Sequence, residues 1–257
     1  MSAAVHLQHS LQANNLNKRY GAHTIVKDVS LEVKSGEVVG LLGPNGAGKT
    51  TSFYMIVGLI ACDQGEIILN GQAITSLPIH RRARLGLSYL PQEASIFRKL
   101  TVEQNIRAVL ELQFLHSQEK ISRQFKKKLI DEKVDILLEE LQITHIKTSL
   151  ALSLSGGERR RVEIARSLAC NPAFILLDEP FAGVDPIAVI EIQKIVKFLK
   201  AREIGVLITD HNVRETLGIC DHAYIINEGK VLAAGLPIEI IENEHVRQVY
   251  LGKNFRM

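Results

Sequence analysis

The chain has 257 residues, of which 46% are hydrophobic and 23% are charged. These values are typical of a folded globular protein and exclude a mostly disordered chain. The net charge of +3 does not indicate nucleic-acid binding, and no apolar run approaches the roughly 18 residues that a membrane-spanning helix needs. The N-terminal segment 1–9 lacks the basic and apolar stretches of a secretory signal.

Three cysteines, Cys62, Cys170 and Cys220, lie far apart in the sequence. Neither a CxxC pair nor an HxxxH or HExxH spacing occurs, so the sequence favours neither a metal site built on such motifs nor a disulfide framework. We expect reduced, mostly buried thiols in a cytoplasmic protein.

The N-terminal part of the chain is predicted to be mainly extended. Segment 11–33 alternates apolar and polar residues, and segment 37–42 is a continuous apolar run typical of a strand buried on both faces. A helix is predicted over 49–59. Asn70-Gly71 stands between two apolar segments, which predicts a tight hairpin.

The middle of the chain is predicted to be helical. Between Thr101 and Leu141 there is no proline, and apolar residues recur at spacings of three and four. Lysines 126–128 and the basic runs 81–84 and 159–161 are expected on exposed helix faces. Contact of the two arginine-rich runs with a partner or with lipid head groups is the open alternative.

Buried strands return after Pro172. Apolar runs at 174–177 and 206–209 flank a helical segment at 187–202, and a further hairpin is predicted around 227–229. Buried strands that alternate with helices predict an α/β fold with a mainly parallel sheet.

The most specific pattern is Gly43-Pro44-Asn45-Gly46-Ala47-Gly48-Lys49-Thr50, which matches G-x-x-x-x-G-K-[ST] at each position. The glycines allow backbone N–H groups to close around phosphate oxygens, and the next helix points its positive end at the same anion. Lys49 is placed to reach the β and γ phosphates. Thr50 offers a hydroxyl to Mg²⁺, and Thr51 is a further hydroxyl near the phosphates. The segment therefore predicts a nucleotide-phosphate site.

An acidic pair, Asp178-Glu179, follows the apolar run 174–177. Ligands of open α/β sheets bind at the carboxyl ends of the strands, so this pair should lie beside the phosphate loop. We predict that Asp178 holds Mg²⁺ through water. Glu179 is then placed to orient or deprotonate the attacking water.

A second anion site is predicted at Leu154-Ser155-Gly156-Gly157-Glu158. Ser155 is a good N-cap, and the paired glycines expose backbone N–H groups at the start of a helix. One nucleotide does not need both this element and a full phosphate loop from the same face of one molecule. A head-to-tail pair of subunits resolves this, with each ATP between the loop of one copy and Ser155–Gly157 of the other.

Taken together, these motifs resemble those of the ATP-binding subunits of ABC transporters over about 11–237. The resemblance implies a P-loop NTPase fold of the ABC ATPase type within a single domain, 1–257. A RecA-like parallel-sheet core and an N-terminal antiparallel β subdomain would occupy about 11–92 and 168–237. An inserted helical subdomain would occupy about 93–167, and a C-terminal tail about 238–257.

The resemblance also implies roles for single residues. Tyr20 is similar to the aromatic residue that stacks on adenine, and Gln92 to the glutamine that contacts Mg²⁺ and the attacking water. His211 resembles the histidine that hydrogen-bonds the γ-phosphate, and Asp185 the loop aspartate that crosses the dimer interface. Because the acidic pair and this histidine are all present, hydrolysis is expected at both sites of a homodimer.

Longer stretches point to one branch of the family. Segments 51–58, 89–101, 209–216 and 246–252 resemble the lipopolysaccharide-export ATPases. The branched-chain amino-acid importer ATPases share the phosphate-loop segment and stay open as an alternative, as does a soluble ABC protein that acts on nucleic acid or ribosomes.

The resemblance implies partners as well. Two membrane permease subunits would each insert a short coupling helix into a groove, for which Phe97 and Arg98 are the candidate residues; a core Phe and a solvated Arg are the alternative. The chain would span no membrane and bind no nucleic acid. It would be cytoplasmic and peripheral on the cytoplasmic face of the inner membrane.

Overall fold

The computed structural model describes residues 9–116, 122–252 and 255. Residues 1–8, ahead of the first strand, lie outside the described residues. So do 117–121 of the predicted helical subdomain and 253–254 and 256–257 of the predicted tail. The described chain is organised by two sheets, one of four strands and one of six.

The larger sheet is mainly parallel, which confirms the prediction. Its strand order is β10-β9-β3-β8-β7-β6, and β10 alone runs antiparallel to its neighbour in the described sheet. Strands β3, β7 and β8 are buried along their whole length, which explains their unbroken apolar sequences. The strands are β3 (Val38–Leu42), β6 (Leu87–Leu90), β7 (Phe174–Asp178), β8 (Gly205–Thr209), β9 (His222–Asn227) and β10 (Lys230–Gly235).

The smaller sheet is antiparallel and is built from the N-terminal part of the chain. Its order is β2-β1-β4-β5. Asn70 and Gly71, with φ of 52° and 78°, connect β4 to β5 and confirm the predicted hairpin, because two left-handed residues match the twist of the flanking strands. The strands are β1 (Ser10–Tyr20), β2 (His23–Lys34), β4 (Gln64–Leu69) and β5 (Gln72–Ala73).

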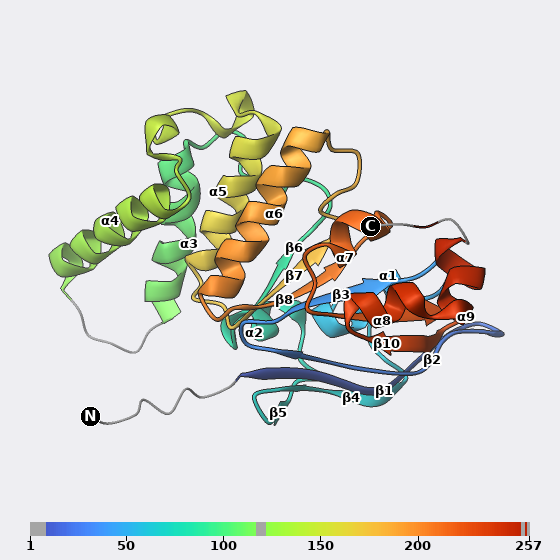
Figure 1. Ribbon diagram of the computed structural model, residues 1–257. Coiled ribbons are helices and arrows are strands. Elements are labelled where there is room, and N and C mark those ends of the chain that lie inside the picture. The colour runs from blue at the N-terminus through green and yellow to red at the C-terminus, as the bar shows by residue number, and fades with distance from the viewer. Residues whose placement is uncertain (1–8, 117–121, 253–254, 256–257) are drawn as a thin grey trace, which may run out of the picture.

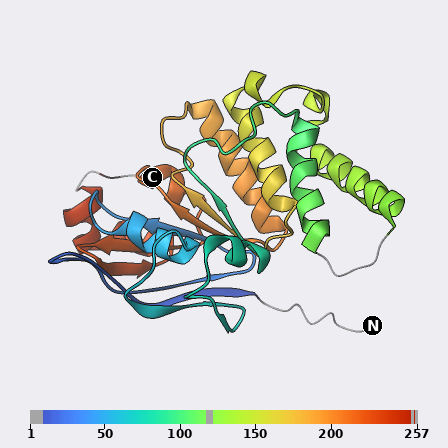
Figure 2. The same ribbon diagram turned by 180° about the vertical axis from the view of Figure 1, so that it is seen from behind.

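The two faces of the larger sheet carry different layers (Figures 1 and 2). One face packs against helix α1 (Lys49–Val57) and the antiparallel sheet, and the other packs against helices α3 to α6. Alternate residues of β7 divide between the two cores: Phe174 and Leu176 belong to the first, Ile175 and Leu177 to the second. This alternation is the side-chain period of a strand buried on both faces.

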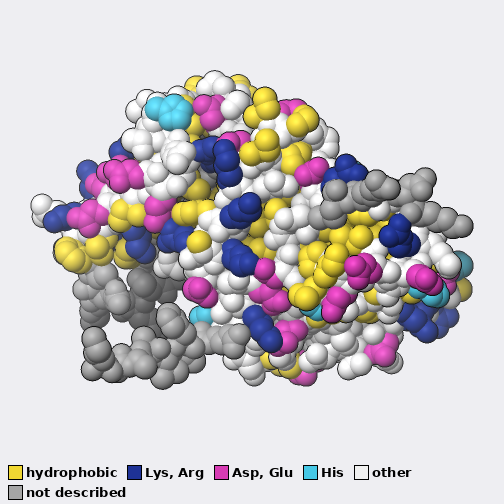
Figure 3. Space-filling view, viewed as in Figure 1, with side chains coloured by type: hydrophobic (Ala, Val, Ile, Leu, Met, Phe, Trp, Pro, Cys, Tyr) yellow, Lys and Arg dark blue, Asp and Glu magenta, His cyan; other side chains and the backbone are white. Residues whose placement is uncertain are grey.

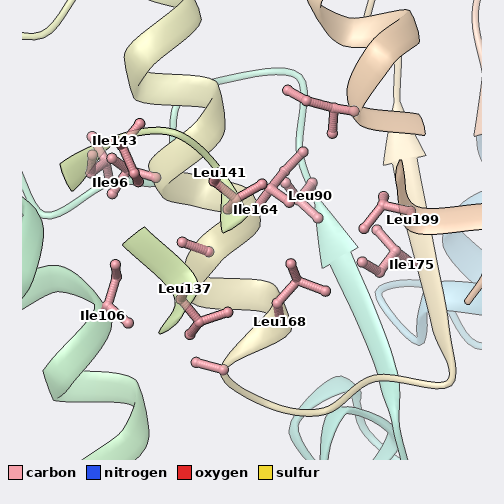
Figure 4. Close-up of a cluster of buried hydrophobic side chains, with 14 of the residues drawn as sticks. Leu90, Ile96, Ile106, Leu137, Leu141, Ile143, Ile164, Leu168, Ile175 and Leu199 are labelled. Atoms are coloured by element: carbon pink, nitrogen blue, oxygen red, sulfur yellow. The ribbon is translucent and has the colours of Figure 1, made fainter. Parts of the chain in front are cut away.

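The helical layer shares one hydrophobic core. Figure 4 shows Ile106, Leu137 and Ile164, from three different helices, in one cluster with Leu90 at the end of β6, with Ile164 next to Leu90. The spacings of three and four between apolar residues correctly predict helical structure here. The segment 101–141, predicted as one helical block, forms two helices, α3 and α4. The helices of this layer are α3 (Val102–His116), α4 (Arg123–Glu140), α5 (Gly156–Leu168) and α6 (Pro186–Ala201).

The C-terminal residues pack onto the strand that leads into the phosphate loop. Ile240 and Val246 form a third core with Leu42, at the end of β3, and Ile225 of β9. This segment comprises α8 (Pro237–Glu242), α9 (Glu244–Val246) and the turn η3 (Arg247–Leu251), beside α7 (Val213–Leu217). Within the described ranges, no helix has the combined length and apolar character needed to cross a bilayer.

The three cysteines, Cys62, Cys170 and Cys220, are free, and each is partly exposed. Free thiols agree with the absence of cysteine spacing motifs. The expectation that the thiols are mostly buried agrees with the structure, because Cys62 and Cys220 pack against hydrophobic cores and burial raises the pKa of the Cys170 and Cys220 thiols.

One of the basic runs contradicts the expectation of exposed side chains. Arg82, in helix α2 (Ile79–Arg84), is only 2% exposed. Its guanidinium donates to the carbonyls of Met55 (2.7 Å) and Ile56 (2.6 Å) in the last turn of α1. It also donates to the carbonyls of Leu77 and Thr75, both at 2.8 Å. The last carbonyls of a helix have no partner within it, and Arg82 supplies one.

Replacing Arg82 with methionine should destabilise the protein by about 3 kcal/mol, because several buried carbonyls lose their donors at once. Thermal unfolding measures this as a melting temperature lowered by about 10 °C. Arg81→Met is the matched control, since Arg81 is exposed on the same helix and should change the stability by less than about 0.5 kcal/mol. Equal melting temperatures for the two variants would contradict the capping role.

Candidate active site

The predicted site residues come to one edge of the larger sheet. Strands β3, β8, β7 and β6 are successive neighbours and run parallel. Their carboxyl ends lead into the phosphate loop, into His211, into Asp178-Glu179 and into Gln92, respectively. The rule that ligands bind at the carboxyl ends of parallel strands therefore correctly predicts that the acidic pair lies beside the phosphate loop, and the same edge of the sheet also carries His211 and Gln92.

The phosphate loop requires glycine where it turns. Gly43 and Gly48 have φ of 142° and 102°. A Cβ atom on Gly43 would lie 2.0 Å from the carbonyl oxygen of Ile226, and one on Gly48 would lie 2.8 Å from that of Ile25. At Gly46, with φ of 76°, no atom lies within 4 Å of such a Cβ, so the loop is open there. The loop is thus packed from behind and open at its middle, as a phosphate cradle must be.

Lys49 folds its side chain back across the loop. Its Nζ donates to the carbonyls of Gly43 (2.7 Å) and Pro44 (2.9 Å) and is largely buried. Burial lowers the pKa of Lys49, while the nearby charges of Glu179 and Asp210 raise it. Thr50 follows at the exposed start of α1, with Thr51 half-buried behind it.

The acidic pair sits beside this loop with two different environments. Asp178 is 4% exposed, and its Oδ2 accepts hydrogen bonds from the hydroxyls of Tyr54 (2.9 Å) and Tyr89 (3.1 Å). Burial raises the pKa of Asp178, and the two tyrosine hydroxyls counteract this. The side chain of Glu179 is 30% exposed, so this carboxylate reaches solvent while Asp178 does not.

Glu179 has a left-handed backbone with φ of 43°. Its N–H donates to the carbonyl of Thr209 at the end of β8, at 2.7 Å. The hydrogen bond turns the chain sharply after β7 and directs Glu179 away from the strand. His211 Nδ1 lies 3.4 Å from Glu179 Oε2, so the structure brings together the two residues predicted to act at the γ-phosphate.

Asp210 is a site residue that sequence reasoning missed. It is fully buried, and its carboxylate accepts from the N–H groups of Phe181 (2.8 Å) and Asn212 (2.7 Å). Burial raises the pKa of Asp210, and these two N–H groups lower it. The carboxylate thereby ties the chain after Glu179 to the chain around His211. The signal was present, because Asp210 follows a buried strand just as Asp178 does.

Ser155 caps helix α5, as predicted. Its side chain accepts from the N–H of Glu158 at 3.4 Å, and the Glu158 carboxylate accepts from the Ser155 N–H at 2.8 Å. This capping box fixes the start of the helix, and Gly156 and Gly157 have open space where side chains would stand. The backbone N–H groups at this end of α5 are therefore accessible to an anion.

Ser155–Gly157 lines a cleft of about 720 Å³ together with Gln92, Glu179 and Asp185. Among the described residues that line this cleft, none belongs to 43–51. The two predicted anion sites of one chain thus do not share this cleft. Asp185 also has a local role, because its Oδ1 accepts from the N–H groups of Ile187 and Ala188 and caps α6.

Phe97 and Arg98 lie in an exposed loop between β6 and α3. Phe97 is 48% exposed, which excludes the alternative of a core Phe. The buried side chain of Asn105 fixes the loop by bonding both the N–H (2.9 Å) and the carbonyl (3.1 Å) of Phe97. The guanidinium of Arg166, from α5, stacks on the Phe97 ring at 4.4 Å.

The second basic run is also less exposed than expected. All of Arg159, Arg160 and Arg161 are partly buried, and the Arg160 side chain is 14% exposed. Arg160 pairs with Glu163 at 3.2 Å, and the Glu163 carboxylate accepts from the N–H of Ser95. The run therefore links α5 to the loop that carries Gln92. Of the lysines in α4, Lys127 and Lys128 are exposed as expected, while Lys126 is half-buried against Phe114.

Tyr20 stands at the tip of the β1–β2 hairpin and is 48% exposed, so it is not a core residue. The ammonium of Lys18 lies 5.5 Å from the centre of its ring. The adjoining Ile25 carbonyl packs against Gly48, so this hairpin end lies beside the phosphate loop.

The phosphate-loop motif at the edge of the larger sheet and the capped, glycine-rich start of α5 agree with the resemblance to ATP-binding cassettes. A family model described as ABC transporter matches residues 26–182. The chain belongs to the ABC transporter family and is an ATPase of that family.

Three similar proteins give detail. LptB of Haemophilus influenzae, a lipopolysaccharide export system ATP-binding protein, is 57% identical over 247 residues, which cover 96% of this chain and 99% of that protein. LptB of Escherichia coli K12 is 55% identical over 248 residues, covering 96% and 99%. The solved ATP-binding cassette MJ1267 of an ABC transporter, in its ADP conformation, matches with a TM-score of 0.81 at 28% identity, covering 95% of this chain and 99% of that one.

Proposed function

We propose that this cassette is the ATP-hydrolysing motor of a transporter that extracts lipopolysaccharide from the inner membrane for export to the outer membrane. The observation that carries the proposal is near-complete coverage by lipopolysaccharide-export proteins at 55–57% identity. Identity at that level favours this cargo over that of the amino-acid importers.

The nucleotide-binding roles follow from the geometry of the loop. The backbone N–H groups of 43–51 would surround the phosphates. The Lys49 ammonium would break its hydrogen bonds to the two loop carbonyls and donate to the phosphate oxygens instead. Tyr20 would stack on adenine. Thr50, Asp178 and Gln92 supply the hydroxyl, carboxylate and amide oxygens that suit Mg²⁺. When bound, Mg²⁺ supplies positive charge that offsets the charge on the phosphates.

Glu179 is the general base in this proposal. It is half-exposed and ends beside His211, so it can accept a proton from water near the γ-phosphate. His211 would hydrogen-bond the γ-phosphate beside that water. The buried carboxylate of Asp210 fixes the segment after Glu179 relative to the segment around His211.

Two copies of the chain would complete each site. Ser155–Gly157 lines a cleft to which no residue of 43–51 contributes among the described lining residues. It would therefore bind the γ-phosphate held by a second copy, with Asp185 crossing between them. Hydrophobic side chains gather over the upper end of α6 in Figure 3, where Val184, Ile187 and Ile190 are exposed. Exposed apolar residues beside a functional loop favour a contact surface.

The groove for the membrane partners would begin at Phe97 and Arg98. A hollow of about 720 Å³ is lined by Val109, Phe114 and Cys170 among others. Val109 lies one helical turn beyond Asn105 on α3, and Cys170 lies just past the end of α5, four residues after Arg166. An exposed aromatic ring stacked on an arginine next to an apolar hollow suits the docking of a short helix. Docking there would place the cassette on the cytoplasmic face of the inner membrane.

Replacing Phe97 with glutamate should lower recovery of the membrane partners about 30-fold or more, because a buried charge replaces an aromatic anchor. Tagged chain is purified from native membranes in mild detergent, and co-purifying proteins and lipids are identified by mass spectrometry. Phe125→Glu is the control, since Phe125 is similarly exposed, at 53%, on α4. ATP binding should be the same in both variants.

The same experiment tests the proposed function. Two permeases recovered with lipopolysaccharide support it. Amino-acid permeases would overturn the cargo, and ribosomal proteins or nucleic acid without a permease would overturn the transporter role. Equal permease recovery with Phe97→Glu and Phe125→Glu would show that the groove lies elsewhere.

A further inference from the structure

Two tyrosine hydroxyls converge on one oxygen of Asp178. Tyr54 lies on α1, one turn beyond Thr50, and Tyr89 lies on β6, three residues before Gln92. Both hydroxyls donate to Oδ2 of Asp178, at 2.9 Å and 3.1 Å. The carboxylate is thus held from the element that follows the phosphate loop and from the strand that leads to Gln92.

The two hydroxyls are fixed by the packing of their rings. The ring centres of Tyr54 and Tyr89 are 6.4 Å apart with an interplanar angle of 79°. Phe53, which is fully buried, lies 6.2 Å from the first ring and 6.1 Å from the second. Tilted and edge-on packing of these three aromatic rings restricts their rotation, so the hydroxyls keep their positions without the carboxylate having to hold them.

The hydrogen bonds determine which carboxylate oxygen is available. An ionised carboxylate can accept about four hydrogen bonds or ligand contacts through its two oxygens. Tyr54 and Tyr89 both use Oδ2, so they leave the lone pairs of Oδ1 for other ligands. A buried carboxylate with one oxygen bound in this way cannot rotate about its last bond without breaking two hydrogen bonds.

Phenylalanine would fill the same space at both positions, so packing alone does not explain the hydroxyls. In metal sites, partners of this kind orient the ligating side chain, and their loss typically weakens metal binding.

We propose that Tyr54 and Tyr89 are positioning residues for Mg²⁺, and that their hydroxyls hold the Asp178 carboxylate so that Oδ1 faces the ion or its bound water. This inference rests on the proposed function, in which Asp178 holds Mg²⁺ in the nucleotide site. It adds two residues to that site which no phosphate-binding motif contains.

The test compares nucleotide binding with and without Mg²⁺. A fluorescent, non-hydrolysable ATP analogue is titrated in EDTA and then at increasing Mg²⁺, for Tyr54→Phe, Tyr89→Phe and the double variant. We expect affinities in EDTA within about twofold of the unmodified chain, and a Mg²⁺ requirement raised about tenfold or more by each substitution. Tyr224→Phe is the matched control, because its half-buried hydroxyl bonds the N–H of Glu32, in the β1–β2 hairpin. It should leave the Mg²⁺ requirement unchanged.

The outcomes separate this inference from the proposed function. If the unmodified chain shows no Mg²⁺-dependent nucleotide binding, the proposed function fails. If it does, and the phenylalanine variants have the same Mg²⁺ requirement, the positioning role is wrong. Equal losses of affinity in EDTA and in Mg²⁺ would show that the hydroxyls support only the fold, which also overturns it.

A second measurement leaves the side chains in place, in case a variant unfolds. The chain contains 5 tyrosines, few enough for fluorine NMR after labelling with 3-fluorotyrosine. Adding Mg²⁺ to the nucleotide-bound chain should shift the resonances of Tyr54 and Tyr89 and not that of Tyr224. Unchanged resonances at both positions would contradict the inference.

Discussion

Glu179→Gln should reduce ATP turnover by about 10²–10⁴-fold while ATP binding persists. Glutamine has the same size and tolerates the same backbone, but its amide cannot accept a proton from water. Neighbouring Asp178 cannot replace it, since that carboxylate is buried and held by two tyrosines. In the proposed dimer, each ATP lies between two copies of the chain. Because the variant can no longer hydrolyse that ATP, ATP-bound dimers should accumulate.

Phosphate release at saturating ATP measures the turnover, and size-exclusion chromatography with ATP measures the dimer. Glu203→Gln is the control: Glu203 is an exposed glutamate that also has a positive φ, 59°, and it precedes β8 at the opposite edge of the sheet. It should retain full turnover. Full turnover in Glu179→Gln would show that another group accepts the proton.

Lys49→Ala should weaken ATP binding by about 100-fold, or about 3 kcal/mol. The ammonium is the cation that the loop itself provides, and it is only 7% exposed, so water cannot take its place at the phosphates. The substitution also leaves the carbonyls of Gly43 and Pro44 without their donor. In the nucleotide-bound chain Lys49 would leave those carbonyls in any case, so the expected loss is that of the attraction between the ammonium and the phosphates.

Isothermal titration with ATP and Mg²⁺ measures this loss. Lys128→Ala, at an exposed position of α4, controls for the change in net charge and should bind ATP normally. A melting temperature near that of the unmodified chain would show that the weaker binding is not caused by unfolding. Unchanged affinity in Lys49→Ala would remove this residue from the site.

Local patterns were sufficient to predict most of the fold. The runs at β3, β7 and β8 are apolar throughout because both faces of each strand are covered. The phosphate loop and the cap at Ser155 were predictable because each is a short backbone conformation with its own residue requirements.

Contacts between distant segments could not be predicted in the same way. Arg82 sits in a run of basic residues that reads as an exposed helix face, and its burial depends on where α1 ends, some 25 residues earlier. Tyr54 and Tyr89 look like ordinary aromatic core residues until the fold brings Asp178 to both hydroxyls. Each of these polar contacts is decided by the tertiary structure, because a buried donor or acceptor must find whichever partner the packing provides.

Because the backbone at Glu179 is left-handed, stability and activity favour different residues at this position. A residue other than glycine costs about 1–2 kcal/mol in that conformation. Glycine would relieve this cost and remove the carboxylate in the same step. A library of this chain selected only for thermal resistance should therefore drift towards an inactive cassette, whereas selection for turnover keeps the less stable residue.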